Sequence, residues 1–273
     1  MGTGQHSDDL RILLAMLCLG LLAGLVSADE TPSTSAAAPE RPPAKVDLRP
    51  KLVEWGISPR QQGNRPTCSV FAFTGALEFA AASQRQRGEQ LSVEFLNWAA
   101  NQSGRRARDG GFFSEMWDGF ARHGICTEKE MPYQAEFDPA RSPALEIRTE
   151  AKQKLALGLR LHWIKKWNVN TGLSGSEFST IKETLNEGWP VCGGFRWPKQ
   201  DQWEDDVLQM CPPAEVFDGH SVLLVGYQND TEQPGGGVFI FRNTNRNGRD
   251  GYMPYTYAQA YMNDAVWIES KPK

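Results

Sequence analysis

The sequence has no excess of positive charge. Its 29 lysines and arginines are outnumbered by 33 aspartates and glutamates, which gives a formal net charge of −4 at pH 7 and a pI near 5.7. Short basic clusters at 85–87 and 105–108 are interrupted or followed by Gly, Glu or Asp, so we interpret them as solvated loops or helix ends. Because phosphate binding needs a concentrated positive surface, we expect no nucleic-acid partner.

The apolar run at the N-terminus is too short to span a membrane. Residues 12–26 form an unbroken run of 15 apolar residues after Arg11, whereas a spanning helix needs about 20. Val26-Ser27-Ala28 follows the pattern that a signal peptidase reads. We therefore predict a signal peptide at 1–28 and a secreted or periplasmic protein without stable membrane insertion. A retained N-terminal anchor is the alternative, which the atypical Asp8 and Asp9 keep open.

Cysteine and histidine are scarce, with five and four residues. No two cysteines have the close spacing that structural zinc sites use, so we expect no metal and no cofactor. Outside the predicted signal peptide four cysteines remain, which allow three disulfide connectivities: Cys68, Cys126, Cys192 and Cys211. A Cys192–Cys211 disulfide is the pairing we favour, because these two flank one excursion of the chain. A fully reduced set is the alternative.

Helices dominate the first half of the chain and strands the second. Residues 29–45 are rich in Pro, Ser, Thr and Ala and predict a flexible linker, followed by a folded domain at 46–273. Apolar spacing predicts helices at 68–87, 93–100, 114–123 and 176–186, and strands at 159–167, 191–197, 221–227, 238–241 and 265–268. This layout, with antiparallel strands, predicts an α+β fold.

Cys68 stands where a thiol can react. The segment Pro66-Thr67 precedes it and the first predicted helix begins with it. A thiol becomes a strong nucleophile as thiolate, and its pKa falls at a helix N-terminus beside a positive histidine. Taken alone, a cysteine among apolar residues is more often a buried structural thiol, so the surrounding motifs decide its role.

Several motifs surround Cys68 in a fixed order. Residues 62–73 (Gln-Gly-Asn-Arg-Pro-Thr-Cys-Ser-Val-Phe-Ala-Phe) place a Gln-Gly pair six residues before the cysteine, and they resemble the nucleophile segment of papain-like cysteine peptidases. Further matches follow the family's order: Val-Asp-Leu-Arg at 46–49, Asp-Gly-Gly at 109–111, Glu-Met-Pro-Tyr at 130–133, Asp-Gly-His-Ser at 218–221 and Arg-Asn-Thr-Asn at 242–245. The resemblance implies two lobes, one helical and one an antiparallel β-barrel-like lobe, with an active site in the cleft for a peptide or protein substrate. It sets no expectation for the oligomeric state.

The resemblance also implies roles for individual residues. Cys68 would be the nucleophile, His220 its base and then the acid for the leaving amine, and Asn243 the residue that orients the imidazole. The Gln62 side chain and the Cys68 backbone N–H would form the oxyanion hole. The separations from Cys68 to His220 and Asn243, 152 and 175 residues, exceed the family's 130 to 150 by roughly 20. We expect the extra residues in a loop at 198–216.

The same resemblance assigns substrate binding to Gly110 and Gly111, where an extended substrate backbone would pair. Phe112 and Phe113, which follow, are candidates for the wall of an apolar pocket, but the resemblance there is too loose to assign them.

The sequence departs from the family at several places. Ser69 and Asn245 stand where tryptophans are usual, the second of which normally shields the Asn–His hydrogen bond from water. Arg65 replaces a cysteine, and no cysteine lies near Asp109 to pair with it, so a characteristic disulfide is absent. Between Ala28 and Val46 there is room only for the linker, so we expect no long inhibitory pro-segment.

These departures leave other functions open. The same fold could be a secreted pseudoenzyme that binds peptides without efficient cleavage, or a hydrolase that acts on another acyl substrate. A third possibility is a transglutaminase-like acyl transferase, which normally uses Asp in the third role, so Asn243 argues against it. The intact set of Cys68, His220, Asn243 and Gln62 favours an enzyme.

Overall fold

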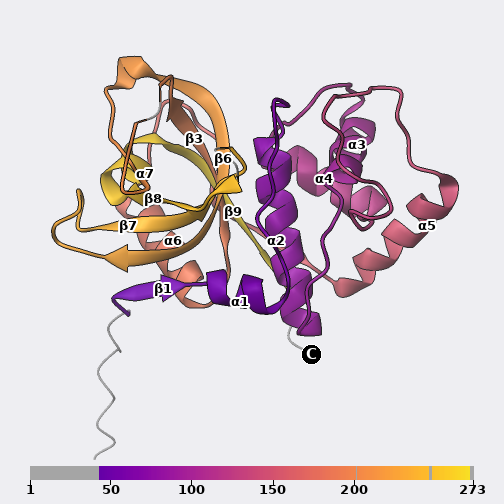
Figure 1. Cartoon of the computed structure of the whole chain (residues 1–273), viewed down its shortest axis with the longest axis horizontal. Helices are drawn as coiled ribbons and strands as arrows, with labels where there is room; N and C mark the ends of the chain where they lie inside the picture. Colours follow the sequence, from indigo (N-terminus) through magenta and orange to yellow (C-terminus); the bar gives the residue numbers. More distant parts are fainter. Residues whose placement is uncertain (1–42, 201, 246–247, 271–273) are drawn as a thin grey trace, which may run out of the picture. The chain divides into compact units, whose positions relative to one another are not determined.

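The computed structural model in Figure 1 describes residues 43–200, 202–245 and 248–270. The predicted signal peptide (1–28) and most of the predicted linker (29–45) lie outside these ranges. The first strand, β1 (Lys45–Asp47), pairs with the long strand β6 (Val216–Asn229). None of the helices within the described ranges has both the length and the apolar character that a bilayer span requires.

The helices of the first half gather around α2 (Cys68–Arg85). Most of its residues are buried, including Phe73 and Leu77, which is typical of a helix with neighbours on every side. It contacts the helices α3 (Val93–Gly104) and α4 (Phe113–His123) and also the sheet. The remaining helical segments are α1 (Arg49–Glu54), α5 (Leu145–Gln153), the 3₁₀ turn η1 (Lys154–Leu157), α6 (Gly175–Asn186), η2 (Pro213–Glu215) and α7 (Tyr255–Tyr261).

The four predicted helices are confirmed, and local capping explains where their ends differ. The helix α2 stops at Arg85 because Gln86 adopts a left-handed conformation, with φ of 55°. At the start of α3, the Ser92 hydroxyl accepts a hydrogen bond from the Phe95 backbone N–H at 2.9 Å. Ser174 and Glu177 form a capping box at the start of α6.

In the described part of the chain, nine strands form one open sheet. Its order is β2-β9-β3-β6-β7-β8-β5-β4, with β1 added beside β6, and all pairs are antiparallel except β5 with β8. The predicted β-barrel-like lobe is therefore corrected in one respect, since β2 and β4 end the sheet within the described chain without pairing to close it. The remaining strands are β2 (Arg160–Lys165), β3 (Val191–Pro198), β4 (Trp203–Glu204), β5 (Val207–Leu208), β7 (Gly237–Arg242), β8 (Gly251–Pro254) and β9 (Met262–Glu269).

The excursion between β3 and β6 does not carry a disulfide. It folds as the short strands β4 and β5, which pair with each other and extend the sheet beyond β8. Cys192 is fully buried in β3 and Cys211 is half-buried in the excursion, and both are free thiols, as are Cys68 and Cys126. The favoured Cys192–Cys211 pairing is therefore wrong, and the reduced alternative holds for the four described cysteines.

Candidate active site

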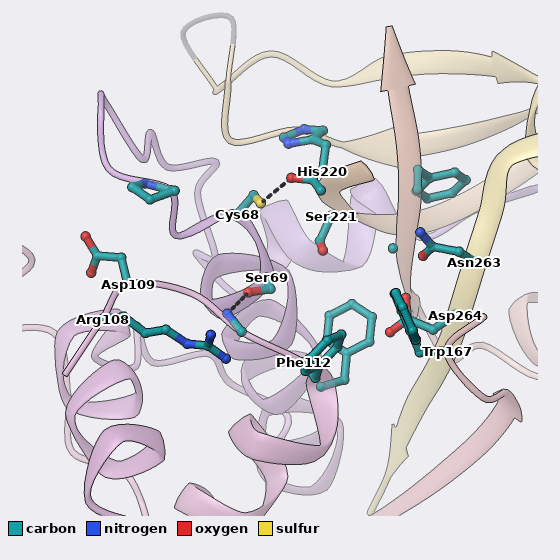
Figure 2. A pocket seen from close by; sticks show the side chains of 16 residues that line it. Cys68, Ser69, Arg108, Asp109, Phe112, Trp167, His220, Ser221, Asn263 and Asp264 are labelled. Atoms are coloured by element: carbon teal, nitrogen blue, oxygen red, sulfur yellow. Dashed lines mark hydrogen bonds between the residues drawn. The ribbon is translucent and has the colours of Figure 1, made fainter. Parts of the chain in front are cut away.

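Cys68 lines a cavity between the helices and the sheet. It is the first residue of α2, so its backbone N–H belongs to the first turn, which has no partner within the helix. The cavity has a volume of about 290 Å³ and is lined by Cys68 and Ser69 from α2, by the stretch around Gly111, and by residues of β3, β6 and β9. Figure 2 shows Cys68 and His220 together at one end of it.

Burial works against ionisation of the Cys68 thiol. The residue is 8% exposed, and burial raises the pKa of its thiol, while the backbone N–H groups of Ser221 and Ser69 act in the opposite direction. The Sγ atom donates a hydrogen bond to the carbonyl oxygen of Gly219 at 3.8 Å. The sequence predicted a lowered pKa at this helix N-terminus, whereas the site favours the neutral thiol. A thiolate here requires a base that takes the proton.

His220 is held in one orientation by Asn243. The imidazole Nε2 lies 3.0 Å from Asn243 Oδ1, and both residues are buried. The Asn245 backbone N–H donates to the same Oδ1 at 3.1 Å, which identifies that atom as the amide oxygen. The Nε2 atom of His220 must therefore be the donor, which leaves Nδ1 as the nitrogen that can accept a proton in the neutral ring.

Trp197 packs against this histidine, although the sequence has no tryptophan in the position where the family usually places one. Its ring centroid lies 4.5 Å from that of His220, in an edge-to-face arrangement. Phe195 pairs with His220 across β3 and β6, and Trp197 lies two residues further along β3, on the same face of the sheet. Trp197 is 5% exposed and also contacts Phe241. An indole from β3 thus covers the imidazole.

Gln62 lies close to the asparagine segment and outside the cavity lining. Its Nε2 donates to the Arg65 carbonyl at 2.9 Å, while its Oε1 accepts from the Thr244 hydroxyl at 2.7 Å. The Gln62 backbone N–H also donates to the Thr244 carbonyl at 3.0 Å. The side-chain amide carries two N–H groups, of which Arg65 takes one. These contacts join the loop before Cys68 to the residue after Asn243.

The two glycines predicted to bind substrate have different surroundings. Gly111 lines the cavity, and its N–H donates to the Ser69 hydroxyl at 3.2 Å. Gly110 is not among the residues that line the cavity, and a side chain there would collide with the Pro66 carbonyl. Its φ of 66° is also in the left-handed region that favours glycine. Ser69, which replaces the usual tryptophan, therefore fixes the Gly111 backbone to α2.

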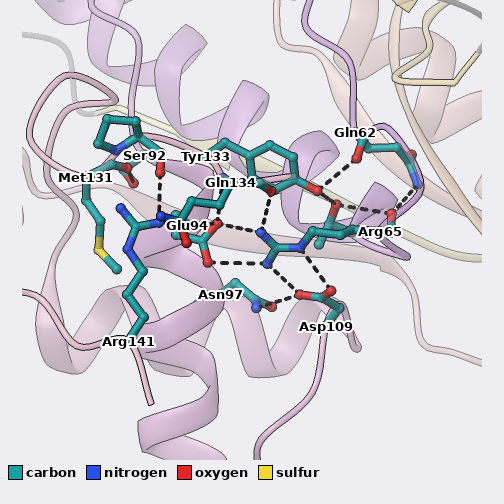
Figure 3. Close-up of polar contacts among 12 residues, drawn as sticks. Gln62, Arg65, Ser92, Glu94, Asn97, Asp109, Met131, Tyr133, Gln134 and Arg141 are labelled. Carbon is teal, nitrogen blue, oxygen red and sulfur yellow. Dashed lines mark hydrogen bonds and ion pairs between the residues drawn. The ribbon is translucent and has the colours of Figure 1, made fainter. Parts of the chain in front are cut away.

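A buried ionic cluster links the segment before Cys68 to the segment before Gly110 (Figure 3). Arg65 Nη2 and Nε donate to the two Asp109 oxygens at 2.7 and 3.0 Å, and Nη1 donates to Glu94 at 2.6 Å. Arg65 is 4% exposed. Burial alone would lower its pKa, but the hydrogen bonds to Asp109 and Glu94 outweigh burial and raise it. In the family's usual pattern a disulfide joins the position of Arg65 to a cysteine near Asp109. Here an ion pair between Arg65 and Asp109 joins the same two segments.

The far side of the cavity contains residues that the sequence analysis did not identify. Trp167 precedes the loop to α6, Gly194 lies in β3, and Asn263 and Asp264 begin β9. Phe112 and Phe113, left unassigned, also line the cavity. Gly194 carried one usable signal, because a glycine inside a strand often marks a close approach by a ligand or another chain segment. Trp167, Asn263 and Asp264 belong to no sequence motif that would have identified them.

Among the described residues, no group of three or more His, Cys, Asp or Glu side chains is arranged to hold a metal ion. The cavity instead presents a thiol, an imidazole fixed by an amide, and nearby backbone N–H groups. This arrangement suits transfer of an acyl group through a thioester.

Comparisons with known proteins agree with this geometry. The chain matches the model of the papain family cysteine proteases over residues 42–270. No curated protein sequence matches it.

Many solved structures share its fold, and three of them illustrate the likeness. Xylellain, a cysteine protease from Xylella fastidiosa, is 22% identical with a TM-score of 0.65, covering 85% of this chain and 87% of that one. Digestive procathepsin L 3 of Tenebrio molitor larval midgut is 20% identical with a TM-score of 0.60, covering 85% and 71%. The Amb a 11 cysteine protease of ragweed pollen, in its proform, is 18% identical with a TM-score of 0.62, covering 87% and 69%. The chain belongs to the papain family of cysteine proteases.

Proposed function

We propose that this protein hydrolyses peptide bonds with Cys68 as the nucleophile. The observation that supports this most strongly is the shared cavity of Cys68 and His220, with His220 held by Asn243 at 3.0 Å. In the first step His220 Nδ1 takes the thiol proton and Cys68 Sγ attacks the substrate carbonyl. The imidazolium then protonates the leaving amine, which departs and leaves a thioester. Water, deprotonated by His220, attacks the thioester, releases the acid and restores the thiol.

The oxyanion that forms during attack needs donors fixed in advance. The Cys68 backbone N–H belongs to the first turn of α2, and the second N–H of the Gln62 amide supplies another donor in our proposal. Thr244 and the Arg65 carbonyl hold that amide in one orientation. Gly111, whose backbone lines the cavity, is the residue we propose to lie along the substrate main chain.

The hydrogen bond from Cys68 Sγ to the Gly219 carbonyl and the burial that raises the pKa of this thiol favour a second candidate, a protein that binds peptides and cleaves them poorly. Hydrolysis of fluorogenic peptides by the purified chain separates the two. The peptidase proposal predicts turnover that is lost in Cys68→Ala and retained in Cys211→Ala, which removes a half-buried thiol outside the cavity lining. Tight peptide binding without turnover in the wild type would support the second candidate instead.

We further propose that residues 1–28 are a signal peptide, residues 29–45 a linker and 46–273 the peptidase domain, and that the protein is exported. Expression with the native N-terminus, followed by N-terminal sequencing of the exported protein, tests this. A new N-terminus at Asp29 supports the proposal. A cell-associated protein that retains residues 12–26 would show that the segment is an anchor.

A further inference from the structure

Residues 110–112, which we call the glycine segment, have all their backbone donors occupied. Three consecutive N–H groups each donate to a side chain: Gly110 to Asn97 Oδ1 at 3.2 Å, Gly111 to Ser69 Oγ at 3.2 Å and Phe112 to Glu115 Oε2 at 2.8 Å. Figure 2 marks the second of these bonds with a dashed line at Ser69. Because each backbone N–H is a single donor, none of the three is left for a ligand.

An ion pair holds the glycine segment in this conformation. Gly111 has a φ of 141°, in the region that favours glycine. A side chain there would collide with Glu115 Oε2 and Arg106 Nη1, and these two atoms form an ion pair at 2.9 Å. The pair therefore packs against the Gly111 main chain. A rotation that turned the Gly111 N–H away from Ser69 would disturb these contacts.

A substrate carbonyl gains nothing by taking the Gly111 N–H from Ser69. The serine lies in the first turn of α2 and is 6% exposed, so water has little access to its hydroxyl. The substrate would form one hydrogen bond and break another, which leaves the free energy of binding nearly unchanged. The tryptophan that the family usually has at this position carries only an N–H donor and could not accept the bond from Gly111. The occupied donor is therefore a consequence of the serine.

The glycine segment still offers an acceptor. In the described part of the chain no donor bonds to the Gly111 carbonyl, whereas the Phe112 carbonyl accepts from the backbone N–H groups of Glu115 and Met116 at 3.0 and 3.2 Å. Gly111 lines the cavity, and we have proposed that the substrate main chain lies along it. Each substrate residue brings one N–H and one carbonyl, of which only the N–H has a partner here.

We propose that Ser69 is a specificity-determining residue: because it occupies the Gly111 N–H, the glycine segment pairs with a substrate N–H but with no substrate carbonyl. The inference rests on the proposed peptidase function and adds to it the group that the substrate must offer. The substrate residue opposite Gly111 carries a free main-chain N–H, which proline and N-methylated residues lack. The carbonyl of that residue adds nothing to binding by the glycine segment.

Peptides with a modified main chain test this inference through binding, without turnover. The proteins carry Cys68→Ala, and dissociation constants are measured by fluorescence anisotropy. Each bond between acyl-side residues is in turn an amide, an ester, which lacks the N–H, or a trans-alkene, which lacks both the N–H and the carbonyl. The ratio of amide to ester affinity reports on a substrate N–H, and the ratio of ester to alkene affinity reports on a substrate carbonyl.

The two ratios have different expected responses to Ser69→Ala. At one bond the ester should bind about 5-fold more weakly than the amide, the effect of one hydrogen bond, and this ratio should be the same with and without Ser69. The neighbouring bond contains the carbonyl of the same residue. There Ser69→Ala frees the Gly111 N–H, so the ester-to-alkene ratio should rise about 5-fold. Each ratio compares peptides on one protein sample, so partial unfolding of a variant does not alter it.

Ser103→Ala in the same Cys68→Ala background is the matched control. The Ser103 hydroxyl also bonds a backbone group of another segment, the Asp118 carbonyl at 3.3 Å, and lies outside the cavity lining, so both ratios should stay as they are. An ester-to-alkene ratio that Ser69→Ala leaves unchanged at every bond would overturn the inference. A ratio that falls would show that the Ser69 hydroxyl donates to the substrate carbonyl, which also overturns it. Equal binding of amide and ester at every bond would do the same.

This readout is separate from the proposed hydrolysis. If the protein that retains Cys68 cleaves no peptide, the peptidase proposal fails, but the binding ratios still decide the role of Ser69. If it cleaves peptides and Ser69→Ala leaves the ester-to-alkene ratio unchanged, the peptidase proposal stands and the inference about Ser69 fails.

Discussion

The indole of Trp197 lies edge-to-face against the imidazole of His220, with 4.5 Å between their ring centroids. The contact comes from strand β3, a part of the chain far from both the histidine and the asparagine motifs. We expect this indole to keep water from the His220–Asn243 hydrogen bond, because competition from solvent would weaken that bond. Another strand of the same sheet would thus take the role that the resemblance places after Asn243.

Replacing this indole should lower the rate more than the affinity. In Trp197→Phe we expect kcat to fall by about 5-fold, because the loss of about 1 kcal/mol from one hydrogen bond lowers a rate by that factor. KM should change little. Steady-state kinetics on a fluorogenic peptide measures both. Trp189→Phe is the control, since Trp189 packs against Phe79 and Trp267 and lies outside the cavity lining. Equal losses in the two variants would show that Trp197 acts only through the stability of the core.

The Arg65–Asp109 ion pair should stabilise the fold in the absence of a disulfide. Arg65→Met removes the buried cation that pairs with the carboxylates of Glu94 and Asp109, so we expect the free energy of unfolding to fall by about 3–5 kcal/mol. Chemical denaturation measures this. Arg85→Met, which removes the exposed Arg85–Glu89 pair, should cost less than about 1 kcal/mol.

A reducing agent provides an independent check on the same point. Because the four described cysteines are free thiols, the melting temperature should be the same with and without dithiothreitol. A clear fall in melting temperature on reduction would reveal a disulfide and contradict this part of the account.

The Gln62 side chain should affect kcat specifically. Gln62→Ala removes the proposed oxyanion donor, and loss of one such donor lowers kcat by about 10² to 10³. Thr244→Val removes only the hydroxyl that holds the amide at 2.7 Å and should have a smaller effect. Similar effects of the two variants on kcat, with similar losses of stability, would indicate that Gln62 serves mainly to join the two segments.

Burial of Cys126 should make the fold less stable at alkaline pH. Burial raises the pKa of this thiol to about 12, and the carboxylate of Glu130 adds to the shift. Above about pH 8.5, the ordinary pKa of a thiol, the unfolded chain loses this proton while the folded chain keeps it. The free energy of unfolding should then fall by up to about 1.4 kcal/mol per pH unit from this group. Its contribution is fully present below that pH and is lost as the pH rises toward 12.

Comparing the wild type with Cys126→Ala isolates this effect, because lysines, tyrosines and Cys192 titrate in both proteins. Denaturant unfolding between about pH 7.5 and 10.5 should show a shallower decline for the variant. Parallel curves would mean that Cys126 is not buried as a neutral thiol.

Much of the fold followed from sequence patterns. The helix that begins at Cys68 was predicted from its apolar spacing, and the apolar run at 221–227 predicted the part of β6 that follows His220. The strands β4 and β5 have two residues each, so they are too short to show the alternation of apolar and polar residues that predicts a strand. The open sheet depends on which strands pair across long stretches of the chain, and the spacing of residues does not determine that pairing. The same holds for the cysteines, because spacing does not show which thiols lie close enough to form a disulfide.

Within the candidate site, the sequence predicted only the residues that stand in motifs of the family. Cys68, His220 and Asn243 stand in ordered segments. The structure places Cys68 and His220 in the lining of one cavity and joins His220 to Asn243 by a hydrogen bond. Trp197 reaches His220 through the register of β3 on β6, and Asp264 reaches the cavity because Gly194 faces it across β3 and β9. Both contacts arise from strand pairing, so no local signal in the sequence reveals them.

The most direct test of the central claim is covalent labelling with a peptidyl epoxide followed by peptide mass spectrometry. The account predicts a single adduct on Cys68 that is absent in Cys68→Ala and forms far more slowly in His220→Ala. Labelling should be blocked by a peptide substrate. An adduct on Cys211, the half-buried thiol, or peptide hydrolysis that persists in Cys68→Ala, would contradict the assignment of Cys68 as the nucleophile.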